Sequence, residues 1–238
     1  MSEAADRVIV ALDFEEAASA FRLVDTLGTD ARHYKVGLQL LTAEGPAVVR
    51  RLVEQGKRVF LDLKLHEIPN SVAGAVTAAG RLGVSMVTVH ASAGSAVLRA
   101  AVEAARPFAG LQVLALTVIT SLRDADLREI GVEGGVRDQV LRLAGLAVAA
   151  GCHGVVASPQ EVALLREALP PGSLIVTPGT QLQGDGAHDH ARVATPLEAV
   201  RDGASHVVIG RSIYRAADPL AAWRRACDEV AEGLGGGY

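Results

Sequence analysis

The chain has 238 residues, of which 50% are hydrophobic and 21% charged, and this length and composition predict a single domain, residues 1–238, with a substantial core. A formal net charge of −4 and a pI near 6.0 provide no positive field for nucleic acid or an anionic membrane. The first residues lack the basic-then-apolar order of a signal peptide, and no apolar run is long enough to span a bilayer. We therefore expect a cytoplasmic protein whose partners are small molecules or a second subunit.

Short runs rich in Val, Ile and Leu alternate with helical patterns from end to end, which is typical of repeated βα units and a parallel sheet. The predicted strands are Val8–Asp13, His33–Leu38, Arg58–Lys64, Ser85–His90, Leu111–Val118, Gly154–Ser158, Ser173–Thr177 and His206–Gly210. The predicted helices are Glu15–Leu27, Ala43–Gln55, Asn70–Leu82, Ser95–Ala105, Val136–Ala150, Pro159–Leu169, Pro196–Asp202 and Pro219–Ala231. Residues 232–238 are glycine-rich and are expected to form a flexible tail.

Eight βα units in about 240 residues predict a parallel eight-stranded TIM (β/α)8 barrel, with a doubly wound sheet as the alternative. In a TIM barrel the active site lies at the C-terminal ends of the strands, so polar residues at those ends should converge on one pocket. The charged residues at or near the ends of the predicted strands are Asp13, Lys35, Asp62, Lys64 and Arg211, and Gly210 precedes Arg211.

The third predicted strand ends in alternating charges. Asp62 and Lys64 share a face with Phe60, because residues two apart in a strand point the same way. Burying a carboxylate and an ammonium group costs several kcal/mol unless they pair or serve a site. A third charge, Glu67, follows within one short loop. These three charges indicate a catalytic site at the C-terminal end of the strand. The alternative is a structural ion pair at the end of the strand.

Two loops that follow strands are unusually long, residues 119–135 and residues 180–194. In barrels, the loops after strands seven and eight commonly bind phosphate, so the ligand is predicted to be phosphorylated. The second loop contains His188, Asp189 and His190, but their spacing fits no closed metal site, so we expect no metal.

Several motifs together resemble the orotidine 5′-phosphate decarboxylase family over essentially the whole chain. Each motif is weak alone, and their order and spacing are specific. They are residues 10–13 (VALD), 35–37 (KVG), 62–71 (DLKLHEIPNS), 89–91 (VHA), 120–121 (TS), 176–179 (VTPG) and 208–213 (VIGRSI).

The resemblance implies a cofactor-free decarboxylation of orotidine 5′-phosphate to uridine 5′-phosphate, in de novo pyrimidine biosynthesis. Lys64 would stabilise and protonate the carbanion at C6, and Asp62 would orient Lys64. Glu67 would reach the active site of the partner subunit in a homodimer with shared sites. The implied catalytic residues are Lys64, Asp62, Glu67 and Lys35. The implied substrate-binding residues are Asp13, Lys35, Thr120, Ser121, Pro178, Gln181, His190, Gly210 and Arg211.

Three site positions depart from the family's pattern: Glu67 replaces an aspartate, Gln181 an arginine and His190 a glutamine. These departures leave two alternatives open. One is a related sugar-phosphate or modified-nucleotide decarboxylase, and the other is a non-catalytic barrel that binds a nucleotide. The retained strand-end quartet of two aspartates and two lysines argues against the second, because a protein that only binds has no need of buried charges.

Overall fold

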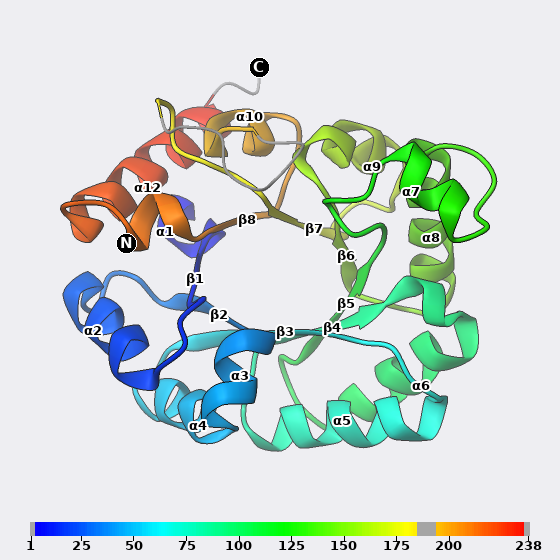
Figure 1. The fold of residues 1–238 in the computed structure, drawn as a ribbon, viewed down its shortest axis with the longest axis horizontal. Coiled ribbons are helices and arrows are strands. Elements are labelled where there is room, and N and C mark those ends of the chain that lie inside the picture. The colour runs from blue at the N-terminus through cyan, green and yellow to red at the C-terminus, as the bar shows by residue number, and fades with distance from the viewer. Residues whose placement is uncertain (1–2, 185–193, 236–238) are drawn as a thin grey trace.

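Eight parallel strands close into a barrel in which each strand pairs with its neighbours in the chain and β8 pairs with β1 (Figure 1). A computed structural model shows this architecture and describes residues 3–184 and 194–235. The closure confirms the predicted TIM barrel and excludes the doubly wound sheet, which would leave two open edges. The strands are β1 (Val8–Ala11), β2 (His33–Gly37), β3 (Arg58–Leu65), β4 (Met86–His90), β5 (Gln112–Leu116), β6 (Gly154–Val156), β7 (Leu174–Pro178) and β8 (His206–Ile209).

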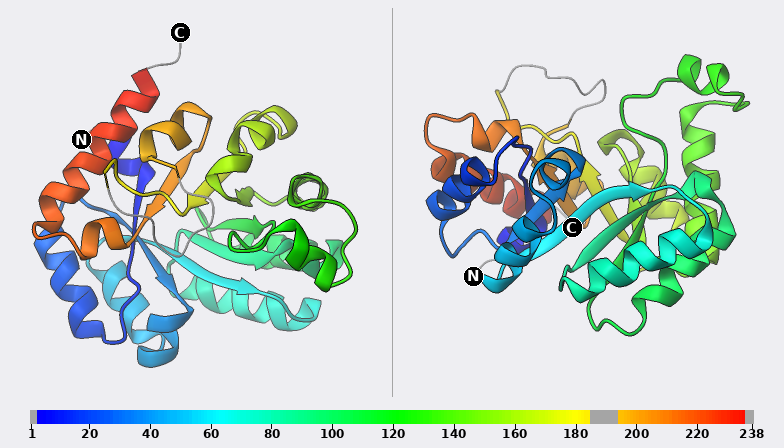
Figure 2. Two further views of the ribbon diagram at one scale, coloured as in Figure 1. Left: turned by 45° about the horizontal axis from the view of Figure 1, so that its top comes forward. Right: turned by 60° about the horizontal axis from the view of Figure 1, so that its bottom comes forward.

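Helices surround the barrel, and the first and last helices, α1 and α12, lie side by side (Figure 2). The helices are α1 (Glu3–Arg7), α2 (Ala17–Leu27), α3 (Leu38–Glu44), α4 (Ala47–Glu54), α5 (Pro69–Arg81), α6 (Ser95–Ala105), α7 (Asp124–Glu129), α8 (Val136–Ala149), α9 (Val162–Ala168), α10 (Pro196–Arg201), α11 (Arg211–Tyr214) and α12 (Pro219–Gly235). Two 3-10 turns, η1 (Ala91–Ala93) and η2 (Pro159–Glu161), precede α6 and α9. Within residues 3–184 and 194–235, no helix is long and apolar enough to cross a membrane.

Several predicted boundaries differ from the structure, and α1 and α11 were not predicted. The single helix expected over residues 43–55 is two helices, because Gly45 ends α3 with a positive φ of 67° and a proline follows it. The long loop over residues 119–135 contains α7, a short helix whose first turn is acidic. The last helix continues to Gly235, so residues 232–235 of the expected tail are helical, and residues 236–238 lie outside the described part.

The core has two layers that follow from the alternation of side chains along each strand. In β1, Val8 and Val10 pack outward against the helices, whereas Ile9 and Ala11 point into the barrel. The interior is filled by a compact set of apolar side chains: Ile9, Ala11, Phe60, Met86, Leu114, Leu116, Val156, Val176 and Val208. These side chains fill the barrel interior, and the cavity at the C-terminal ends of the strands lies above them.

One irregularity in the sheet shapes that mouth. Leu61 pairs with Val87 and Leu65 pairs with Val89, so β3 advances four residues while β4 advances two. The extra length is a bulge of β3, and bulges re-aim the side chains that they carry. Lys64 lies within it and is the only non-glycine residue of the described ranges with a positive φ, at 51°.

Candidate active site

The C-terminal ends of the strands surround a cavity of about 490 Å³, which is within the usual size range of small-molecule sites. Nine of the residues predicted for the site line this cavity: Asp13, Lys35, Asp62, Lys64, Thr120, Pro178, Gln181, Gly210 and Arg211. They come from the ends of strands that are far apart in the chain, as closure of the barrel requires. Glu67 and Ser121 are exposed and do not line the cavity, and His190 lies outside the described residues.

Two ion pairs lie at the site. Lys64 Nζ lies 2.7 Å from Asp62 Oδ2, and Lys35 Nζ lies 2.8 Å from Asp13 Oδ1. Asp62 and Lys35 are buried, with 8% and 9% of their surface exposed. Each buried charge is therefore matched by an opposite charge at hydrogen-bond distance, which is the condition under which burial is tolerated.

Small residues make room for the pair of Lys35 and Asp13. A Cβ atom on Gly37 would lie 2.9 Å from Lys35 Nζ and 3.6 Å from Asp13 Oδ1. On the other side, a Cβ on Gly210 would lie 3.7 Å from Asp13 Oδ2. The lack of a side chain at Gly37 thus lets the ammonium group of Lys35 approach the carboxylate of Asp13 directly.

The backbone of Lys64 is held in the left-handed region, which costs a residue with a side chain on the order of 1–3 kcal/mol. Such strain persists only where the surroundings fix it. Here the Lys64 ammonium group is held by Asp62, and its backbone N–H donates to the Thr88 hydroxyl at 2.8 Å. The conformation turns the lysine side chain into the cavity at the point where β3 ends.

Hydrogen bonds to β8 and to Ala194 hold the first residues of the segment after β7. The Thr180 hydroxyl donates to the carbonyl of Val208 at 3.0 Å, and the Gln181 N–H donates to the carbonyl of Ala194 at 3.1 Å. The Gln181 side chain is 9% exposed, and its Nε2 has no hydrogen-bond partner within residues 3–184 and 194–235. This leaves an amide donor at the wall of the cavity.

Glu67 lies just before α5, outside the cavity. Hydrogen bonds from the Ser71 side chain and from the Ile68 backbone N–H lower the pKa of this carboxyl group. Its charge is therefore held at the start of a helix, on the surface that surrounds the mouth of the barrel.

Several residues at the site were not predicted from the sequence. Gln39, Tyr214 and Arg215 line the cavity, and Thr88 contacts the Asp62–Lys64 pair from β4. Burial, and next the charge of Asp13, raises the pKa of Tyr214. Thr88 had a signal in the sequence, because it is a polar residue between two valines of its strand. The other three lie within or beside short helices that follow strands, where no periodic pattern marks them.

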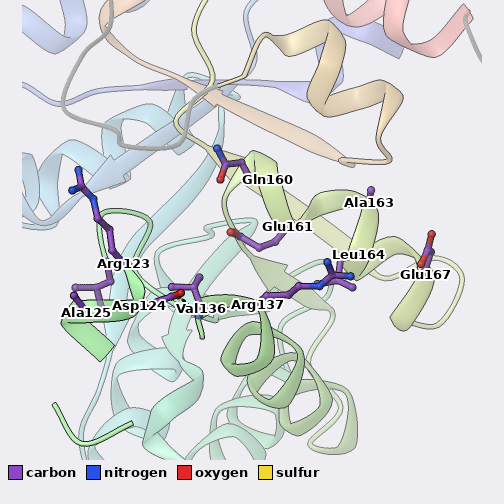
Figure 3. Close-up of a pocket in the computed structure, with 11 residues that line it drawn as sticks. Arg123, Asp124, Ala125, Val136, Arg137, Gln160, Glu161, Ala163, Leu164 and Glu167 are labelled. Carbon is purple, nitrogen blue, oxygen red and sulfur yellow. Dashed lines mark hydrogen bonds between the residues drawn. The ribbon is translucent and has the colours of Figure 1, made fainter. Parts of the chain in front are cut away.

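A larger cavity, of about 740 Å³, lies between α7, the start of α8 and α9 (Figure 3). Arg123, Arg137 and Glu161 are among the residues that line it, and none of the predicted site residues does so. Within the described part of the chain, no group of three or more His, Cys, Asp or Glu side chains is arranged to hold a metal ion. The strand-end cavity is therefore the candidate active site.

The fold and the site define a TIM barrel with a charged active-site cavity at the C-terminal ends of its strands. Comparison with known proteins identifies the family more closely. The model of the orotidine 5′-phosphate decarboxylase / HUMPS family matches residues 6–226. The chain therefore belongs to this family.

Individual relatives are similar over almost the whole chain. The orotidine 5′-phosphate decarboxylase of Moorella thermoacetica is 50% identical over 234 residues, which cover 95% of this chain and 93% of the relative. That of Anaeromyxobacter dehalogenans is 49% identical over 219 residues, covering 92% of this chain and 96% of the relative. The crystal structure of orotidine 5′-phosphate decarboxylase from Lactobacillus acidophilus superposes with a TM-score of 0.85 at 36% identity, covering 94% of this chain and 98% of that one.

Proposed function

We propose that this protein decarboxylates orotidine 5′-phosphate to uridine 5′-phosphate, a step of de novo pyrimidine biosynthesis, without a cofactor. The observation that carries the proposal is the ion-paired Lys64 at the mouth of the barrel, beside the second pair formed by Lys35 and Asp13. A cation fixed in a cavity of this size suits a reaction in which negative charge develops on a substrate carbon.

Lys64 supplies both charge and proton in this proposal. As the bond between C6 and the carboxylate breaks, CO2 leaves and its electron pair remains on C6. The Lys64 ammonium group stabilises this carbanion and then gives it a proton, and the neutral amine regains a proton from water. Lysine suits the task because its ammonium group is a compact charge on a flexible stem.

Asp62 holds the ammonium group through its Oδ2 atom at 2.7 Å. In the substrate complex the Asp62 carboxylate would also lie near the departing carboxylate, and like charges would favour loss of CO2. Both effects require that the carboxylate of Asp62 keep one orientation while the substrate binds.

The remaining contacts are assigned along the length of the nucleotide. Asp13 and Lys35 would bind the ribose hydroxyl groups, and Thr120 together with Ser121 would contact the pyrimidine. Gly210 and Arg211, at the end of β8, would bind the phosphate.

Two further groups would take part at the phosphate end. The buried amide of Gln181 would donate to the substrate, and His190 would approach the phosphate from the loop that follows β7. Binding energy gained at the phosphate can be used to hold the pyrimidine against Lys64, although the phosphate itself does not react.

We also propose a homodimer in which Glu67 acts at the site of the partner subunit. Glu67 is exposed, and Ile68 next to it is 61% exposed, as is Leu38 at 57% just after β2. Large apolar side chains exposed near the mouth of a barrel favour burial against another surface. A second copy of the chain would cover them and bring its own Glu67 toward the cavity.

The first experiment follows the absorbance of the pyrimidine after orotidine 5′-phosphate is added to the purified protein. Decarboxylation is expected with wild type. Lys64→Ala should lower kcat by about 10²- to 10⁴-fold, the usual contribution of a general acid, or by more. Lys57→Ala is a matched control, because Lys57 donates to the carbonyls of Gly28 and Ala31 away from the cavity. Lys64→Ala activity within about tenfold of wild type would contradict the assigned role.

The shared site is tested by mixing subunits. If Lys64→Ala and Glu67→Ala proteins are each inactive, exchange of subunits creates heterodimers in which one site has both residues intact. Part of the activity should then return, and Glu67→Asp should remain active. No recovery after subunit exchange has been demonstrated would refute the shared site.

A further inference from the structure

Thr88 lies on β4 opposite the bulge of β3. Its neighbours Val87 and Val89 point outward, so Thr88 points toward the barrel interior on the same face as Met86. It is 0% exposed. Leaving a buried hydroxyl group without a hydrogen bond costs free energy, so the two partners that Thr88 has indicate what it does in the fold.

The two partners of Thr88 are the two residues of the catalytic ion pair. The Thr88 hydroxyl donates to Asp62 Oδ1 at 2.9 Å and accepts from the backbone N–H of Lys64 at 2.8 Å. The directions are fixed by chemistry, since an ionised carboxylate only accepts and a backbone N–H only donates. One side chain therefore uses both of its hydrogen-bonding roles on the ion pair.

One of the two hydrogen bonds restricts the Asp62 carboxylate, and the other restricts the backbone of Lys64. With Oδ1 bound to Thr88, the Asp62 carboxylate cannot rotate, and its Oδ2 stays directed at the Lys64 ammonium group, 2.7 Å away. The bond from the Lys64 N–H ties the backbone of the bulge to β4 and supports the residue at its positive φ of 51°.

We propose that Thr88 is a positioning residue of the decarboxylation, which orients Asp62 and fixes the backbone of Lys64 without touching the substrate. This inference rests on the proposed function of the site, because it assigns a purpose to the geometry of the Asp62–Lys64 pair. Thr88 does not line the cavity, so its removal should affect the chemical step more than the binding of nucleotide.

Thr117 provides a matched control. It is also a strand-end threonine that is 0% exposed, and its hydroxyl donates to the carbonyl of Val156 at 3.1 Å. Its side chain contacts no charged group of the site in any described hydrogen bond. Thr117→Val therefore removes a buried hydroxyl of the same kind and reports the structural cost alone.

The test compares Thr88→Val, Thr88→Ser and Thr117→Val. Thr88→Val should lower kcat for orotidine 5′-phosphate by about 10- to 100-fold, the effect of a small misplacement of a reacting group, while the Kd for uridine 5′-phosphate changes less than about threefold. Thr88→Ser, which keeps the hydroxyl, and Thr117→Val should stay within about threefold of wild-type kcat. If Thr88→Val does not fold, Thr88→Ala carries the same expectation.

A second measurement needs no substrate. Hydrogen exchange at the Lys64 amide should be at least about tenfold faster in Thr88→Val than in wild type, and unchanged in Thr88→Ser, because the hydroxyl is the acceptor that protects this N–H. Unchanged exchange, or a kcat of Thr88→Val within threefold of wild type, would overturn the positioning role. A wild-type protein that does not decarboxylate the nucleotide would instead overturn the proposed function, and exchange at Lys64 would still decide the role of Thr88 in holding the pair.

Discussion

Two histidines at the other end of the barrel should make its stability depend on pH. His33 begins β2 and His206 begins β8, the two strands that flank β1. Their rings stack with centroids 6.0 Å apart and planes inclined by 18°. His33 is 4% exposed, and burial disfavours a positive charge on either ring.

The surroundings of His33 oppose its protonation. Burial, and next the positive charge of Arg58, lower the pKa of His33 from 6.5 to about 4, with Arg32 acting the same way and Asp6 against it. The pKa therefore lies below that of the unfolded chain, so the stabilisation is complete above pH ~6.5 and is lost as the pH falls toward ~4.

His206 behaves in the same way for similar reasons. Burial, then the charges of His33, Arg7 and Arg58, lower its pKa from 6.5 to about 4, and Asp6 opposes them. Because His33 is one of these causes, the two rings titrate as a coupled pair, and their effects are not simply additive.

The magnitude follows from proton linkage. For one ring, a pKa of 6.5 in the unfolded chain and about 4 in the fold imply that the free energy of unfolding falls by about 2 kcal/mol between pH 7.5 and pH 5.0. For the pair, the loss is expected to be about 3–4 kcal/mol. This pH range lies above the ordinary pKa values of aspartate and glutamate, so most carboxylates do not contribute.

The assay is urea unfolding at fixed protein concentration from pH 7.5 to 5.0, with wild type, His33→Gln, His206→Gln and the double variant. Glutamine does not titrate, so its effect on the free energy of unfolding should be the same at every pH. This constant effect cancels when the change in the free energy of unfolding between pH 7.5 and 5.0 is compared among the proteins. Each single variant should lose about half of the wild-type pH dependence and the double variant most of it. Equal pH dependence in all four proteins would refute the reasoning.

Three further substitutions have predictable outcomes. Gly37→Ala should leave the free energy of unfolding within about 1 kcal/mol, because the new Cβ would lie too close only to the flexible end of Lys35. The same substitution should raise KM roughly tenfold, because it displaces that ammonium group. Gly154→Ala should lower the free energy of unfolding by about 2 kcal/mol or more in calorimetry, because its Cβ would collide with the backbone carbonyl of Leu174. Lys64→Gly should be more stable than Lys64→Ala by about 1 kcal/mol in urea unfolding, although both are inactive, because glycine adopts a positive φ without strain.

The sequence predicted the barrel and most of the cavity because both depend on local patterns. The alternation along β3 places Phe60, Asp62 and Lys64 on one face, and the structure has all three at the cavity wall. The rule that active sites lie at the C-terminal ends of barrel strands then brought these residues together with Arg211, which lies far away in the chain.

The parts that were not predicted depend on pairing between strands. A bulge is a relation between two strands, so the pattern of β3 alone cannot show the extra residues or the positive φ of Lys64. Thr88 was visible as a polar residue on an inward face, but its partners follow only from the shifted register between β3 and β4. The roles of Glu67 and Ser121 stay predictions, because neither side chain reaches the cavity within one subunit.

The strain at Lys64 shows how chemistry and stability are opposed at this site. Glycine would suit the left-handed backbone best, but it provides neither charge nor proton, so a lysine at this position keeps a conformation that costs on the order of 1–3 kcal/mol. The hydrogen bond from its N–H to Thr88 and the ion pair with Asp62 offset that cost. A straight strand would avoid the strain, yet the bulge is what turns the ammonium group into the cavity. The regular pairing of β3 with β4 is therefore interrupted where the ammonium group of Lys64 has to point into the cavity.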